Sequence, residues 1–136
     1  MSITPSDDEL VEQAARLLNP HRVGDRLFGD VASIVVSEAG NQYGGVCIDT
    51  ACGTGFCAEH AAVAAMVTAG EYRISRLVAV WRGEDNQLYV LPPCGRCRLF
   101  VHQIDPGNLE AQVVLARGVS VAMRELLPST QWPDPY

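Results

Sequence analysis

Two cysteine-containing segments constrain the fold of this chain most strongly. Cys57 stands at the start of an alanine-rich apolar segment, and Cys94 and Cys97 form a Cys-x-x-Cys motif directly after two prolines. Both segments are predicted to begin helices, and residues three apart in the first turn of a helix share one face. A fold that brings the two helix N-termini together would offer three sulfur ligands to one zinc ion and leave the fourth tetrahedral position open.

The rest of the chain alternates helix and strand patterns around these two segments. The first helix has Ser6 as its N-cap and acidic residues in its first turn. A hairpin opens the sheet and crossover helices follow, which predicts an α/β, three-layer α/β/α fold with a mixed five-stranded sheet. The 136 residues are expected to form a single domain, 1–136. The sequence predicts helices at 6–18, 57–69, 94–104 and 121–127, and strands at 31–37, 42–48, 76–81, 87–91 and 111–116.

The charged residues exclude several classes of function. All ten basic residues are arginine, which excludes a lysine Schiff base and the lysine of a P-loop. A net charge of −6 makes long nucleic acid an unfavourable partner. No apolar run is long enough to cross a bilayer, so no membrane partner is expected. The acidic, polar first residues do not resemble a secretory signal, and five cysteines are an odd number, so a reducing, cytoplasmic location is expected.

Glu59 is the candidate for proton transfer. It follows Cys57 by two residues, a spacing at which it should not bind the same ion but can reach a water molecule held there. Other interpretations of the cysteines remain open at this point. The Cys-x-x-Cys motif also occurs in redox pairs and structural zinc knuckles, and Cys47 or Cys52 would close the site as a fourth thiolate ligand.

The two motifs together resemble a known family. Cys57-Ala58-Glu59 and the run Pro93-Cys94-Gly95-Arg96-Cys97-Arg98 are similar to the paired motifs of the cytidine deaminase family, in its three-cysteine, small-subunit branch. Within the family the similarity is greatest to the blasticidin-S deaminases. It covers about residues 29–132 and includes Val31-Ala32-Ser33, the segment 124–129 and Trp132.

The resemblance implies a fold, a reaction and an assembly. The fold would be cytidine deaminase-like, with Zn2+ held by Cys57, Cys94 and Cys97 as the cofactor. The reaction would be hydrolytic deamination of a cytosine-containing small molecule, with Glu59 as the proton carrier and the carbonyl groups of Ala58 and Pro93 accepting hydrogen bonds from the substrate's amino group. The protein would be a homotetramer.

Two positions depart from the family pattern. Where nucleoside-using members have Asn-x-Glu to hold the ribose, this chain has Cys47 and Asp49, which become the candidate substrate contacts. Where many members have arginine after the catalytic glutamate, this chain has His60. Because Zn2+ with three thiolates carries a formal charge of −1, positive charge is needed to favour ionisation of a bound water. Helix N-termini supply part of it, and Arg96, Arg98 and His60 are the candidate charge-compensating residues.

Three functions follow as hypotheses. The substrate is cytidine or deoxycytidine, or it is a cytosine-containing antibiotic of the blasticidin S type, which the acidic charge balance and the missing asparagine favour. Alternatively, the chain is a non-catalytic structural-zinc or binding module that retains the fold.

Overall fold

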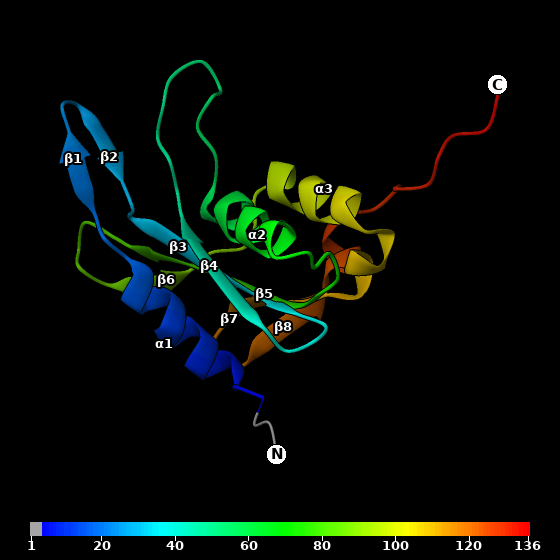
Figure 1. The fold of residues 1–136 in the computed structure, drawn as a ribbon, viewed down its shortest axis with the longest axis horizontal. Coiled ribbons are helices and arrows are strands. Elements are labelled where there is room, and N and C mark those ends of the chain that lie inside the picture. The colour runs from blue at the N-terminus through cyan, green and yellow to red at the C-terminus, as the bar shows by residue number, and fades with distance from the viewer. Residues whose placement is uncertain (1–3) are drawn as a thin grey trace.

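A mixed six-stranded sheet lies between two layers of helix in the computed structural model, which describes residues 4–136 (Figure 1). β5 and β7 run parallel, and the other strand pairs are antiparallel. β6 and β7 both pair with the same edge of β5. β6 pairs with the last residues of β5, and β7 pairs with residues near its start. The sheet order is β4 (Gln42–Val46), β3 (Val31–Ser37), β5 (Ile74–Arg82), β7 (Gln112–Ala116) and β8 (Val119–Ala122), with β6 (Leu88–Val90) attached to β5.

The helices divide between the two faces of this sheet. α1 (Asp7–Leu17) covers one face, and α2 (Ala58–Thr68) and α3 (Gly95–Ile104) cover the other (Figure 1). Alternation along β3 fills both interfaces, since Ile34 packs in the core beneath α1 and Val35 in the core beneath α2 and α3. The predicted three-layer architecture is confirmed. None of the described helices is long and apolar enough to cross a membrane.

The predicted five strands are too few. The segment 121–127, predicted as a helix, begins within β8, and a short 3-10 turn, Met123–Leu126, follows. Gly118, with a φ of 72°, makes the tight turn that folds β8 back onto β7. A second, separate hairpin of β1 (His21–Val23) and β2 (Arg26–Phe28) was not predicted, and a further 3-10 turn spans Pro106–Glu110.

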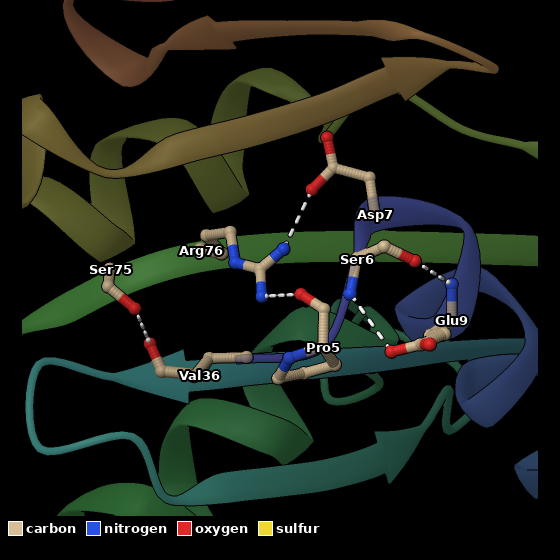
Figure 2. A network of polar contacts seen from close by, with 7 residues as sticks. All are labelled: Pro5, Ser6, Asp7, Glu9, Val36, Ser75 and Arg76. Carbon is tan, nitrogen blue, oxygen red and sulfur yellow. Dashed lines mark hydrogen bonds and ion pairs between the residues drawn. The ribbon is translucent and has the colours of Figure 1, made fainter. Parts of the chain in front are cut away.

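The start of α1 is fixed by polar contacts (Figure 2). The Ser6 hydroxyl accepts a hydrogen bond from the backbone N–H of Glu9 at 3.1 Å, and the Glu9 carboxylate accepts one from the N–H of Ser6 at 3.0 Å. This reciprocal pair is a capping box. Arg76 of β5 then joins the helix to the sheet, because its guanidinium donates to Asp7 at 2.9 Å and to the carbonyl of Pro5.

Ser6→Ala is therefore expected to lower the free energy of unfolding by about 1 kcal/mol, since it leaves the N–H of Glu9 without its acceptor. Urea denaturation followed by circular dichroism measures the change. Ser120→Ala is the matched control, because Ser120 is exposed on β8 and should be neutral on substitution. Equal effects of the two substitutions would contradict the capping role.

Glycine sets the distance between β4 and α2. A Cβ atom at Gly45 would lie 2.4 Å from the Cβ of Ala61 and 2.6 Å from the backbone nitrogen of Ala62. Any side chain at this position would collide with the helix, so the absence of one allows α2 to pack directly on the strand.

Candidate metal centre

The three cysteines of the two motifs meet at the N-termini of α2 and α3. Cys57 is the N-cap of α2, Cys94 is the N-cap of α3, and Cys97 lies in the first turn of α3. The sulfurs of Cys57 and Cys94 are 3.5 Å apart, and those of Cys94 and Cys97 are 3.3 Å apart. All three lie within 4.8 Å of one another, so the structure brings together the three residues that the sequence singles out.

The spacing of these sulfurs suits zinc. Tetrahedral coordination with zinc–sulfur bonds of about 2.3 Å places the sulfurs about 3.8 Å apart, slightly farther than the separations seen here. Across residues 4–136, this trio is the one group of three or more His, Cys, Asp and Glu side chains close enough to share an ion. Cys47 and Cys52, the candidates for a fourth thiolate, are not part of it. Three sulfur ligands leave one tetrahedral position for another ligand.

Glu59 lies beside this group without belonging to it. As the second residue of α2 it is only 4% exposed. Burial raises the pKa of its carboxyl, and hydrogen bonds from its own backbone N–H and from the Cys97 thiol oppose that increase only in part. A carboxyl with a raised pKa next to an open coordination position is the arrangement expected of a group that accepts and returns protons.

The cysteines differ in how readily they ionise. Burial raises the pKa of the Cys57 and Cys97 thiols, and the Glu59 charge adds to the effect at Cys97. Burial acts in the same direction at Cys94, but hydrogen bonds from the Cys97 backbone N–H and from the neighbouring sulfurs outweigh it and lower the pKa of Cys94. Because a metal binds thiolates, its binding here must release protons from this cluster.

His60 contacts a sulfur from a fixed ring position. Its Nδ1 lies 3.4 Å from the sulfur of Cys97. Its ring stacks on Phe100, with centroids 4.2 Å apart, and more distantly on Phe56. Burial, followed by the nearby Arg96 charge, lowers the pKa of His60 and favours the neutral imidazole. A neutral imidazole can contact this sulfur as a hydrogen-bond donor or acceptor, depending on which ring nitrogen carries the proton.

The two arginines of the second motif contact carbonyl oxygens. Arg96 donates to the carbonyl of Gly55 at 3.4 Å. Arg98 donates to the carbonyl of Pro93 at 2.7 Å and to that of Leu126 at 3.2 Å. The hydrogen bonds to sulfur that the sequence suggested for these arginines are not among the contacts of the described residues. Arg98 instead joins the segment before α3 to the 3-10 turn Met123–Leu126.

The two predicted substrate contacts lie at the end of β4. Ile48 forms an isolated backbone bridge with Phe56, with both N–H···O distances at 3.0 Å, and this bridge places the end of β4 beside the start of α2. Cys47 is half-buried, and its thiol donates to the carboxylate of Asp30 at 3.2 Å. Burial, with a further contribution from Asp30, raises the pKa of this thiol. Asp49 is exposed.

Asp30 is the polar residue at this site that the sequence did not indicate. It directly precedes β3. The N–H of Cys47 donates to the carbonyl of Val31, and the N–H of Gly29 donates to the carbonyl of Cys47, so Asp30, between Gly29 and Val31, lies beside Cys47. The sequence did contain a signal for this contact. In the predicted hairpin of 31–37 and 42–48, the residue before the first strand, Asp30, lies close to the end of the second strand, where Cys47 stands.

The two backbone positions suggested as substrate contacts are also placed. Pro93 is buried, and its carbonyl accepts from Arg98 while retaining a second lone pair. Ala58 is the first residue of α2. The carbonyl of such a residue points along the helix, whereas its N–H has no partner within the helix. The group that Ala58 presents outward is therefore its N–H.

The overall structure resembles solved cytidine deaminases. A mutant of the enzyme from Mycobacterium tuberculosis matches with a TM-score of 0.75 at 23% identity, over 94% of this chain and 99% of that chain. The enzyme from Burkholderia pseudomallei matches with a TM-score of 0.72 at 24% identity, over 91% and 98%. That from Bacillus anthracis matches with a TM-score of 0.71 at 21% identity, over 92% and 88%. No protein-family model matches the chain. By its structure, the chain has a cytidine deaminase-like fold.

Proposed function

We propose that this protein is a zinc-dependent hydrolase that removes the 4-amino group of a cytosine-containing nucleoside or nucleoside antibiotic. The observation that carries the proposal is the position of the buried Glu59 beside three sulfurs that leave one metal position open. The likeness to cytidine deaminases supports the same reaction.

The proposed catalytic group is the Glu59 carboxylate. The chemistry that zinc supplies in a site held by Cys57, Cys94 and Cys97 is a lowered pKa of a water molecule. Glu59 would take a proton from a water molecule at the site and deliver it to N3 of the ring as the water oxygen adds to C4. Glu59 would then transfer the remaining hydroxyl proton to the amino group, which would leave as ammonia. The raised pKa of Glu59 suits both directions of transfer.

Backbone groups would orient the base. The carbonyl of Pro93 has a free lone pair that would accept a hydrogen bond from the 4-amino group, and Arg98 fixes its direction. The free N–H of Ala58 would donate to an acceptor on the ring, in place of the carbonyl contact that the resemblance suggested. His60 would donate to the sulfur of Cys97 and offset part of the negative charge of three thiolates.

The substrate is proposed from the residues at the end of β4. Cys47 replaces the amide that holds ribose in nucleoside-using members of the family, so the blasticidin S type of substrate is proposed alongside cytidine and deoxycytidine. Membership of the three-cysteine, small-subunit branch and assembly as a homotetramer belong to the same proposal. Light scattering on the purified protein tests the assembly.

The experiment is an absorbance assay on the zinc-loaded chain with cytidine, deoxycytidine and blasticidin S in parallel, together with a measurement of zinc per chain. Loss of cytosine absorbance and release of ammonia with any of them would support the proposal. Bound zinc with no deamination of the three would contradict it and favour a non-catalytic zinc module.

A further inference from the structure

We propose that Cys94 and Cys97 are a site of reversible oxidation, at which a hydroperoxide converts the two thiols of the zinc-free chain into a disulfide that blocks zinc binding. This inference goes beyond the proposed deaminase function and does not depend on it. It rests on the distance of 3.3 Å between the two sulfurs and on the difference in their exposure.

The two cysteines belong to one turn at the start of α3. Cys94 is the N-cap and Cys97 follows three residues later, so their side chains stand on the same face of the helix. The backbone N–H of Cys97 donates to the sulfur of Cys94 at 3.4 Å. A disulfide bond is about 2.05 Å long, so the two sulfurs need to approach each other by only about 1.3 Å. Forming this bond does not require α2 and α3 to move relative to each other.

Exposure gives the two thiols different roles. Cys94 is exposed, whereas Cys97 is fully buried. A peroxide in solution therefore reaches the sulfur of Cys94 first, and Cys97 is the thiol that lies behind it. The sulfur of Cys57 is also near, at 3.5 Å from that of Cys94, but Cys57 caps α2 and a bond to it would have to join two helices. The pair within one turn is therefore favoured.

The reaction takes two steps, with hydrogen peroxide as the oxidant. The sulfur of Cys94 attacks one peroxide oxygen, the O–O bond breaks, and the products are a sulfenic acid and a water that carries off the Cys94 thiol proton. The sulfur of Cys97 then attacks the sulfenic sulfur. The S–O bond breaks as the S–S bond forms, and the hydroxyl leaves as a second water with the Cys97 proton. The two sulfurs lose two electrons, and the peroxide gains them.

The disulfide and the zinc ion exclude each other. Zinc is bound by thiolates, and a disulfide has none to offer. Oxidation leaves Cys57 as the one free thiol of the three-sulfur group, and a single thiolate cannot hold the ion there. Bound zinc in turn engages the sulfurs that the peroxide must reach, so the zinc-loaded chain resists oxidation. A dithiol reductant returns both cysteines to thiols by exchange and restores the site.

The positions of the arginines allow the bond to be mapped. Trypsin cleaves after lysine and arginine, and the chain has no lysine. Cleavage therefore separates the three cysteines onto three peptides, which are 27–73 with Cys57, 83–96 with Cys94 and 97–98 with Cys97. The zinc-free chain is treated with hydrogen peroxide, alkylated at its free thiols, digested and analysed by mass spectrometry. Zinc uptake is measured by dialysis against zinc before and after reduction with dithiothreitol.

Peptides 83–96 and 97–98 are expected as one linked species, with Cys57 alkylated and zinc uptake lost until dithiothreitol is added. The zinc-loaded chain should be oxidised at least about tenfold more slowly. Cys97→Ser should give no linked species. Cys52→Ser is the matched control and should behave as wild type, because Cys52 is exposed but lies outside the three-sulfur group. Circular dichroism checks that both variants are folded.

Three results in wild type would overturn this inference. The first is a link between peptides 83–96 and 27–73, and the second is a Cys94 that stays unlinked, whether as a thiol or as a sulfinic acid. The third is full zinc uptake by the oxidised chain. All three leave the deaminase function standing, since the absorbance assay on the reduced, zinc-loaded chain tests it separately.

Discussion

Glu59→Gln is expected to lower the rate of deamination by at least about a thousandfold while zinc remains bound. Glutamine has nearly the same shape as glutamate but cannot carry the proton from water to the ring and then to the leaving amino group. Because Glu59 is not a member of the group that can hold the ion, the substitution should leave zinc per chain unchanged. Single-turnover kinetics and elemental analysis of the purified variant measure the two quantities.

The stability of this variant provides a second check. The pKa of Glu59 is raised by burial, so its ionised form is unfavourable in the folded chain, and glutamine removes that cost. The thermal midpoint of the metal-free Glu59→Gln protein should be no lower than that of wild type near neutral pH. Glu12→Gln, on the exposed side of α1, is the matched control and should retain full activity. Substantial activity in Glu59→Gln would refute the proton-transfer role.

Cys97→Ala is expected to abolish stable zinc binding and, with it, activity. Cys97 is fully buried between the other two sulfurs and His60, and two remaining thiolates cannot hold zinc in the same way. Dialysis against a mild chelator, followed by measurement of zinc per chain, should leave wild type loaded and the variant depleted.

The matched control for Cys97→Ala is Cys52→Ala. Cys52 is exposed in the loop between β4 and α2, and it lies outside the three-sulfur group. Its φ of 61° is no worse for alanine than for cysteine, so the change should be neutral. Depletion of zinc from Cys52→Ala to the same extent as from Cys97→Ala would show that the metal is bound elsewhere.

Long, strongly patterned segments made most of the fold predictable. The sequence gives the bounds of β3 as the structure has them, and places the starts of α1, α2 and α3 within one residue. Ser6 is the N-cap, as predicted. Proline, glycine and capping residues mark the ends of these elements, and their effects on the backbone are local.

Short elements were missed because their stability comes from tertiary contacts. β1 and β2 have three residues each, which is too few for an alternating pattern to emerge. The last two residues of β8 were predicted as the start of a helix at 121–127, a segment that contains good helix-forming residues. Its pairing with β7 overrides that preference, as Gly118 turns the chain sharply enough for the two strands to meet.

The sequence predicted the residues of the site better than their contacts. The cysteines and Glu59 follow from motif spacing at the starts of two helices. The partners of Arg96 and Arg98, and the approach of Asp30 to Cys47, depend on how separate segments pack. Such contacts between segments distant in the chain are not encoded in local periodicity.

The lack of a side chain at Gly45 has a consequence for how this protein can change over time. The separation of α2 from the sheet is fixed by direct backbone contact rather than by an adjustable side chain. Residues on the outward side of α2, such as Ala64 and Ala65, can vary without moving its first turn. A methyl group added at Gly45 would instead collide with Ala61 and Ala62 and displace α2, the helix that Cys57 caps. Substitutions on the outer surface of α2 are therefore tolerated, whereas position 45 on the strand beneath it must remain glycine.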